Sequence, residues 1–313
     1  LLTLSLGRYP QWQTFMIYLT TLLMGCWLIQ YPLPDIPIVH AASQRLLTIR
    51  THLVAELQVF PETSSAIISA MALGDKSMLT RETREVFNIS GAGHVLALSG
   101  LHLGILYMMV SLLVRGHRFR FVAQVVTIVL LWFYAFLVGL SPSVVRAATM
   151  LTVYGLLSLG YRQKTSINTL AFTAIVMLVI HPHALFEVGF QMSFLAVFAI
   201  LVCYPLLYGL ISEKWLMEHS VIRWLWGMTT VSLSAQIGAA PLIAFYFHRF
   251  SSYFLLSNLI VVPCAYLILM GTLLYLLTHF SLLATILSII TDFMYQSLQW
   301  IASLPFATLT IEH

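Results

Sequence analysis

Charged residues are scarce in this 313-residue chain. They make up 8% of the sequence, 60% of the residues are hydrophobic, and the mean hydropathy is +0.92. Because soluble domains carry about 25% charged residues, this composition excludes an ordinary soluble protein. The polar segments are also too short to build a second, soluble domain. We therefore expect one all-α, polytopic integral membrane protein.

Cysteine is equally rare. Cys26, Cys203 and Cys264 lie in separate apolar stretches without CxxC spacing, which argues against a disulfide framework or a zinc site. The sequence also lacks a Walker loop, an HExxH string and a GxSxG elbow, and it contains no internal repeat and no low-complexity segment. We therefore expect no catalytic residue, no bound metal and no cofactor.

Long apolar runs are what the sequence has in abundance. A run of about 20 apolar residues is typical of a helix that crosses a bilayer. The runs cover residues 14–29, 93–114, 121–139, 143–160, 167–180, 187–211, 223–247, 253–277 and 282–304. They predict about nine crossing or re-entrant helices, and we expect the first to be a true membrane helix rather than a cleaved signal peptide. Pro241 and Pro263 predict breaks in two of them.

One long segment, residues 33–91, is polar. Apolar side chains recur there at helical spacing: Leu46, Ile49, Leu53, Leu57 and Phe60. This spacing predicts an amphipathic helix in the membrane interface, followed by a second helix over 61–73 and a charged connector over 76–88. The expected organisation is an N-terminal membrane helix (1–32), this outer segment (33–91), a membrane core (92–304) and a tail (305–313).

Basic residues predict the orientation, because cytoplasmic loops collect Lys and Arg. Placing the basic loop 115–120 in the cytoplasm leaves Arg249 alone in the short outer loops. The basic residues that then lie inside are Arg8, Arg115, Arg118, Arg120, Arg162, Lys164, Lys214 and Arg223. We therefore expect the N-terminus in the cytoplasm and residues 33–91 outside.

Two histidines lie in the run 93–114, where an imidazole is costly. On one continuous helix, His94, Ser99 and His102 fall within roughly 140° of arc. Gly100 and Gly104 lie opposite and predict a close-packing face. The polar face indicates either a functional surface or neutral imidazoles bonded within the bundle. Ser99 beside His102 also suggests a hydrolase, but the sequence offers no third member of a triad.

Arg146 lies about one turn inside its helix, too deep for an ordinary flanking charge. Its guanidinium matches phosphate oxygens, so it is a candidate anion contact; alternatively it extends to the interface or pairs with Glu187. Glu187 and Gln191 lie one turn apart and share a face. They line a pathway or serve as structural partners.

Two further polar positions remain open. Thr229, Ser232 and Gln236 share a face, although Ser and Thr in membrane helices often bond their own backbone, and residues 238–241 predict a close-packed break. Asn258 precedes Pro263 and either caps a half-helix or joins two helices.

Several motifs occur together and in order: ALGDK at 72–76, HVLALSGLH at 94–102, GLSPSVVRA at 139–147, GFQMSFLA at 189–196, and AQIGAAP at 235–241 with 258–263. In this combination the chain resembles the competence domain of ComEC-type proteins, the inner-membrane channel for DNA uptake in natural transformation. The resemblance implies that one DNA strand passes into the bacterial cytoplasm. The candidate path residues are His94, Ser99, His102, Ser143, Arg146, Glu187, Gln191, Gln236 and Asn258.

The resemblance also implies single-stranded DNA as a partner, with a receptor and a nuclease outside. The composition implies the lipid bilayer, and the missing Walker loop implies a separate cytoplasmic motor or strand-binding protein. Fuller family members add an oligonucleotide-binding domain and a metallo-β-lactamase-like nuclease domain. The sequence has no HxHxDH string, and residues 33–91 are too short for the former. We expect a non-enzymatic channel, either a minimal member or a piece of a longer protein.

Two rival hypotheses remain. A proton- or ion-coupled solute transporter would use His94, His102 and Glu187 as titrating groups. An intramembrane hydrolase would use Ser99 or the histidines for catalysis.

Overall fold

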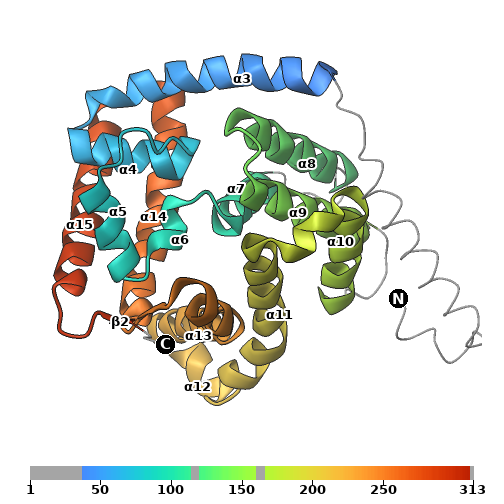
Figure 1. The fold of residues 1–313 in the computed structure, drawn as a ribbon, viewed down its shortest axis with the longest axis vertical. Coiled ribbons are helices and arrows are strands. Elements are labelled where there is room, and N and C mark those ends of the chain that lie inside the picture. Colours follow the sequence, from blue (N-terminus) through green and yellow to red (C-terminus); the bar gives the residue numbers. More distant parts are fainter. Residues whose placement is uncertain (1–36, 114–119, 160–165, 311–313) are drawn as a thin grey trace, which may run out of the picture.

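The computed structural model describes residues 37–113, 120–159 and 166–310 (Figure 1). The predicted helix at 14–29 and most of the basic loop at 115–120 lie outside these residues. The described chain is all-α apart from one short two-stranded sheet, which confirms the predicted fold class.

Helices follow one another with short connections. The first ones are α3 (Pro37–Glu56), α4 (Glu62–Leu73), α5 (Arg81–Ile89), α6 (Gly93–Leu96), α7 (Gly100–Leu113), α8 (Arg120–Leu137) and α9 (Pro142–Leu159). The later ones are α10 (Ser166–Ile180), α11 (Val188–Tyr208), α12 (Glu213–Glu218), α13 (Ser220–Phe247), α14 (Phe254–Thr278) and α15 (Ser281–Ala302). Two 3₁₀ turns, Leu57–Val59 and Pro182–Phe186, join α3 to α4 and α10 to α11.

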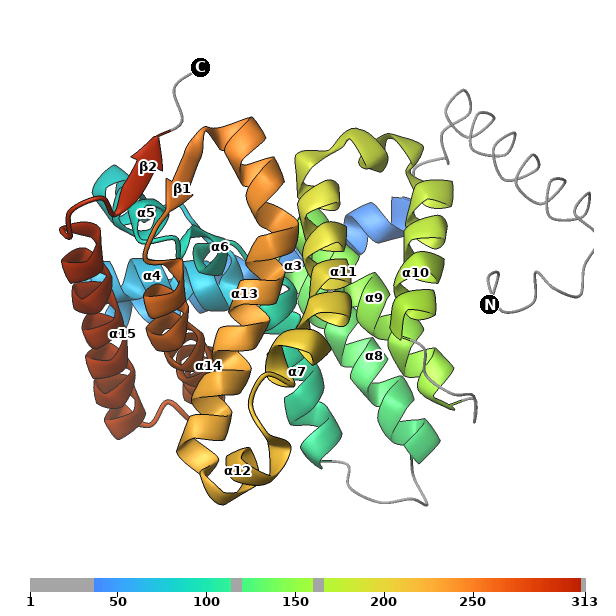
Figure 2. The same ribbon diagram turned by 90° about the horizontal axis from the view of Figure 1, so that it is seen from below.

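The helices form two lobes (Figures 1 and 2). The α4 lobe contains α4, α5, α14 and α15, and the α9 lobe contains α7 to α10. The long helix α3 crosses one edge of both lobes, while α6 lies between them. Helices α11 and α13 pack along each other and connect the α9 lobe to α14.

Helix α4 is the buried centre of its lobe. Every residue from Ser64 to Leu73 is buried, because small side chains let α14 and α15 approach closely. Gly74 ends the helix in the left-handed conformation (φ 71°), as a C-terminal glycine commonly does. Ile67, Ile68 and Met71 are fully buried in the core that continues into α14 and α15.

Four described helices are long and apolar enough to cross a membrane: α11, α13, α14 and α15. Three shorter apolar helices cover Gly100–Ser111, Phe121–Leu137 and Ile167–Ile180. The predicted count of about nine crossings is therefore not confirmed. The predicted positions of the apolar helices are confirmed from residue 121 onwards, since each run there coincides with a helix to within a few residues.

Neither predicted proline break occurs. Helix α13 continues through Pro241 and α14 through Pro263, so Asn258 does not cap a half-helix. A proline removes one backbone N–H donor from the helix. Membrane helices tolerate this loss because neighbouring helices can satisfy the carbonyl group that is left free. The predicted close packing is confirmed at Gly238, where a Cβ atom would collide with the Leu195 carbonyl oxygen and the Ala199 side chain.

The charged connector predicted at 76–88 is also partly wrong, because it contains α5. Thr80 caps this helix: its hydroxyl accepts a hydrogen bond from the Thr83 N–H at 3.1 Å.

Near the C-terminal end of the described chain, β1 (Arg249–Ser251) pairs antiparallel with β2 (Thr308–Thr310). This pairing fixes the α13–α14 loop against the segment that follows α15.

Candidate functional site

The predicted helix over 93–114 is two helices, α6 and α7, separated by an extended residue, Ala97 (φ −91°, ψ 127°). His94 lies on α6, whereas His102 lies on α7. The prediction of a single polar face through His94, Ser99 and His102 is therefore wrong. Hydropathy does not reveal the break between α6 and α7, because the break depends on how Ser99 caps the start of α7.

Ser99 and His102 form a reciprocal cap at the start of α7. The Ser99 hydroxyl accepts a hydrogen bond from the Leu101 N–H at 3.3 Å, and the Ser99 N–H donates to His102 Nδ1 at 3.3 Å. This is the arrangement of a capping box, with an imidazole in place of the usual acidic side chain. Since a backbone N–H only donates, Nδ1 is the acceptor, and the neutral imidazole carries its proton on Nε2.

That proton has no acceptor in the part of the chain that the structure describes. His102 is fully buried, and Nε2 has no hydrogen-bond partner among the described residues. A buried donor without an acceptor costs about 1–3 kcal/mol. His94, exposed on α6, donates from Nδ1 to the Gly91 carbonyl oxygen at 3.2 Å and lies close enough to His102 for the two imidazoles to interact electrostatically.

Arg146 provides a second buried donor. Its side chain on α9 is 7% exposed, and Nε has no hydrogen-bond partner in the described part of the chain. The guanidinium lies over Gly189, where a Cβ atom would come within 3.2 Å of Nη2. Glu187 attracts Arg146, but its carboxylate makes its ion-pair contact with His181 at 3.5 Å. Glu187 thus acts on Arg146 through its charge without an ion pair between the two among the described residues, and the predicted pairing stays a prediction.

The beginnings of α7 and α9 meet. The Ser143 hydroxyl donates to the Leu98 carbonyl oxygen at 2.7 Å, and a Cβ atom on Gly100 would lie 3.6 Å from the Ala147 side chain. We use the name donor site for two buried donors, His102 Nε2 on α7 and Arg146 Nε on α9, which do not touch each other: Gly100 faces Ala147 of α9, and His102 lies about 200° from Gly100 around α7. Helix N-termini add positive potential there. Gly104 faces no atom within 4 Å, so the predicted glycine packing face is wrong at that position.

The α4 lobe supports the donor site from the other side. The end of the Leu98 side chain lies against Gly74, whose positive φ (71°) disfavours any other residue, and the Tyr134 hydroxyl donates to the Ala72 carbonyl oxygen at 2.7 Å. Ser257 at the start of α14 donates to the Ser90 carbonyl oxygen at 2.6 Å. These contacts hold the loop between α5 and α7 in place.

The remaining predicted residues lie farther along α11, α13 and α14. Gln191 donates to the Leu185 carbonyl oxygen at 2.9 Å and accepts from the Tyr246 hydroxyl at 3.3 Å, so it joins α11 to α13. Gln236 is half-buried on α13. Asn258 is half-buried on α14, and its buried Oδ1 has no partner among the described residues.

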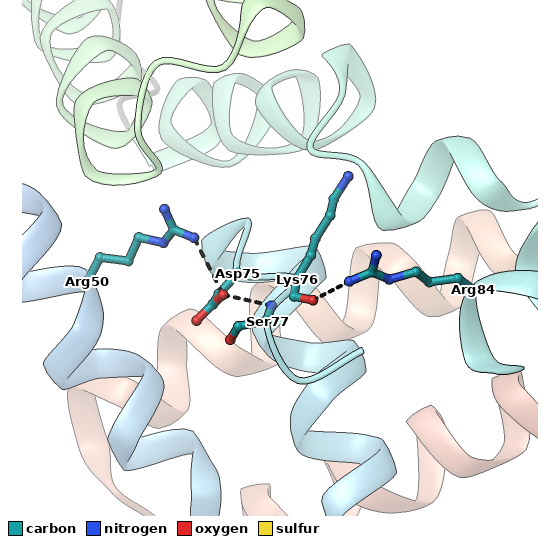
Figure 3. A network of polar contacts seen from close by, with 5 residues as sticks. All are labelled: Arg50, Asp75, Lys76, Ser77 and Arg84. Carbon is teal, nitrogen blue, oxygen red and sulfur yellow. Dashed lines mark hydrogen bonds and ion pairs between the residues drawn. The ribbon is translucent and has the colours of Figure 1, made fainter. Parts of the chain in front are cut away.

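The ALGDK motif consists of the last two residues of α4, Ala72 and Leu73, and the start of the loop that follows, which is held between α3 and α5 (Figure 3). Asp75 Oδ1 lies 3.8 Å from Arg50 Nη2 and accepts the Ser77 N–H at 3.0 Å, while Arg84 donates to the Lys76 carbonyl oxygen at 2.7 Å. The Lys76 side chain extends away from these contacts. The motif thus joins the buried end of α4 to a charged loop in which Asp75 is half-buried and Lys76 is exposed.

Sequence reasoning missed one residue of the same kind as Arg146. Asp292 is a carboxylate inside the apolar helix α15, and it accepts a hydrogen bond of 2.5 Å from the Ser64 hydroxyl of α4. An ionisable residue inside a membrane-length apolar run is the signal that identified Arg146. The same signal was available for Asp292.

Comparisons with known proteins give a consistent result. The family described as "Competence protein" matches residues 71–313. The chain is 32% identical over 225 residues to ComE operon protein 3 of Bacillus subtilis, covering 70% of this chain and 27% of that protein. It is 38% identical over 181 residues to an uncharacterized protein of Aquifex aeolicus, covering 57% and 40%. It is 23% identical to recombination protein 2 of Haemophilus influenzae, covering 63% and 26%.

The chain thus spans about a quarter to two fifths of the length of these relatives. No solved structure matches it.

Proposed function

Because the chain belongs to the competence protein family, we propose that it forms a channel that conducts single-stranded DNA across the bacterial inner membrane. The observation that carries the proposal is the donor site. His102 Nε2 and Arg146 Nε are buried donors that find no acceptor among residues 37–113, 120–159 and 166–310, and a phosphodiester oxygen is an acceptor of the required kind.

The small number of these donors suits the passage of a DNA strand better than its tight binding. A site that conducts a polyanion needs few positive charges, because a continuous basic groove holds the strand tightly and slows it. Arg146 is the charged member, and His102 contributes a neutral N–H. The helix N-termini of α7 and α9 add partial positive charge without adding a mobile cation.

The hydrolase alternative lacks a third group. A serine nucleophile needs a base that accepts its proton, and His102 Nδ1 lies 3.3 Å from both the nitrogen and the hydroxyl oxygen of Ser99. No acidic side chain among the described residues orients this imidazole, because Nε2 has no hydrogen-bond partner there. The Ser99 hydroxyl also accepts the Leu101 N–H. Both groups therefore serve the start of α7.

The transporter alternative requires His94, His102 and Glu187 to exchange protons. Glu187 contacts His181 instead of either of these histidines. The predicted inner-membrane orientation, with the N-terminus in the cytoplasm and residues 33–91 outside, belongs to the channel proposal, as do the receptor, nuclease and motor as partners.

Replacing Arg146 by Gln tests the proposal. Uptake of labelled DNA by cells with normal amounts of the protein in the membrane should fall about tenfold or more, because a hydrogen bond to a charged donor is lost. Arg249→Gln is the matched control, since Arg249 is exposed on β1, and it should leave uptake unchanged. Uptake at the wild-type rate in Arg146→Gln would refute the phosphate contact.

A further inference from the structure

The loop that follows α4 gathers basic side chains from three elements. Arg50 comes from α3, Lys76 from the loop itself and Arg84 from α5 (Figure 3). Arg84 donates to the Lys76 carbonyl oxygen at 2.7 Å, and Arg50 Nη2 lies 3.8 Å from Asp75 Oδ1. These contacts hold three positive charges around one carboxylate.

That carboxylate is already engaged. Besides facing Arg50, Asp75 Oδ1 accepts the Ser77 N–H at 3.0 Å. Lys76 and Arg84 are exposed, and neither belongs to an ion pair found in the described part of the chain. Because Arg84 is bound at the backbone of Lys76, two like charges are held on the same loop. An anion that contacts both side chains would relieve their repulsion.

The other acidic residues of the polar segment lie away from this loop. Glu56 ends α3 and Glu62 begins α4, so both stand at the opposite end of a 12-residue helix about 18 Å long. On α5, Glu82 and Glu85 lie about 160° and 100° around the helix from Arg84. Positive charge is therefore concentrated at the C-terminal end of α4.

The basic loop also stands beside the helix starts that carry the donor site. A Cβ atom on Gly139, at the turn between α8 and α9, would lie 3.5 Å from Arg50 Nη1. Gly74 lies against Leu98, whose carbonyl oxygen accepts the Ser143 hydroxyl at the start of α9. Helices α6 to α10 add no carboxylate here, because their sequence contains no acidic residue. An anion bound at the loop is thus close to the entrance of the donor site.

We propose that Lys76 and Arg84, with Arg50 behind them, bind phosphates of a single DNA strand before the strand reaches the donor site. We call these three side chains the entry cluster. Ammonium and guanidinium groups both donate charge-assisted hydrogen bonds to phosphate oxygens. Continuity with the donor site favours a strand over an anionic lipid headgroup. The inference rests on the proposed function and adds the place where the strand is first held.

Fluorescence anisotropy of a labelled phosphodiester oligonucleotide with the purified protein in detergent tests the entry cluster without transport. The double variant Lys76→Gln/Arg84→Gln should raise Kd about tenfold or more at low salt, because two charge-assisted contacts are lost. The slope of log Kd against log salt should fall by about 1.4, since each phosphate contact on a single strand contributes about 0.7.

A matched control removes two charges elsewhere. Arg45→Gln/Arg249→Gln changes exposed arginines on α3 and β1, and it should keep the wild-type affinity and salt slope. Lys76→Gln alone keeps the test decisive if the double variant does not fold, because the Lys76 side chain makes none of the contacts in Figure 3. It should produce about half of the change in slope.

The outcomes separate the entry cluster from the channel. Unchanged affinity and slope in Lys76→Gln and in the double variant would overturn the entry cluster, and so would a wild-type protein that does not bind the oligonucleotide; DNA uptake by Arg146→Gln would still test the channel. Unchanged DNA affinity with weaker binding to phosphatidylglycerol vesicles would also overturn it and identify a lipid headgroup as the ligand. Weaker DNA binding by these variants of a protein that conducts no DNA would support the cluster and refute the channel.

Discussion

The donor site and the entry cluster both offer hydrogen-bond donors to a phosphate, but in opposite surroundings. At the donor site, His102 Nε2 and Arg146 Nε are buried, whereas Lys76 and Arg84 of the entry cluster are exposed. Exposed charges attract a strand from a distance and are screened by salt, whereas a buried donor without an acceptor gains most from direct contact. We therefore expect the entry cluster to set how often a strand is captured and the donor site to set how long it stays.

Reversing the charge of Arg146 at the donor site should have the largest effect on DNA uptake. Arg146→Glu places a carboxylate where phosphates are proposed to pass, so DNA uptake should fall about 100-fold or more, through repulsion added to the lost donor. Oligonucleotide binding at the entry cluster should persist, because Lys76 and Arg84 are unchanged. Loss of all binding would show that the two regions do not act separately.

A steric change next to the guanidinium should have the next largest effect. Gly189→Val places methyl groups against Arg146, because even a Cβ atom comes within 3.2 Å of Nη2, and uptake should fall about tenfold as the guanidinium is displaced. Gly227→Ala is the control on another helix, since no atom lies within 4 Å of a Cβ there. Normal uptake by Gly189→Val would mean that the position of Arg146 is not critical.

The cap and the donor function of His102 are separable. Ser99→Ala removes the side-chain cap and should lower stability by about 1 kcal/mol with little change in uptake per folded molecule. His102→Leu removes both the cap acceptor and the Nε2 donor, so uptake per folded molecule should fall severalfold. The check is uptake normalised to folded protein in the membrane. Equal normalised uptake in both variants would limit His102 to a structural role.

The smallest expected effect compares a paired hydroxyl with an unpaired one. Ser143→Ala loses the bond to the Leu98 carbonyl oxygen and should destabilise the protein by about 1 kcal/mol. Ser69→Ala removes a hydroxyl that has no partner among the described residues and should be neutral or slightly stabilising. Tm measurements of both variants decide this. A destabilised Ser69→Ala would mean that its hydroxyl has a partner outside the described residues.

Much of the helical architecture was predictable from sequence. Runs of apolar residues from 121 onwards mark helices to within a few residues, because a membrane-length apolar run leaves little alternative to a helix. The α6–α7 break was not predictable from hydropathy, since residues 93–114 are apolar on average and the break depends on the local cap that Ser99 and His102 form. At Pro241 and Pro263 the error was the reverse: breaks were predicted and the helices are continuous, because packed membrane helices tolerate proline.

The candidate sites were only partly predictable. Arg146 and His102 were identified by the cost of a polar group in an apolar run, but their unpartnered nitrogens depend on contacts with distant helices. Asp292 carried the same signal. Its partner Ser64 lies 228 positions away, so the association of α15 with α4 is a tertiary property that spacing along the chain does not encode.

Electrical recording from the purified protein in a planar bilayer tests the central claim most directly. A single-stranded phosphodiester oligonucleotide should block the ionic current in brief, repeated events. Arg146→Gln, or a strand with uncharged methylphosphonate linkages, should shorten the events about tenfold. Events of the same duration for both strands and both proteins would contradict a channel in which the donor site contacts the DNA phosphates.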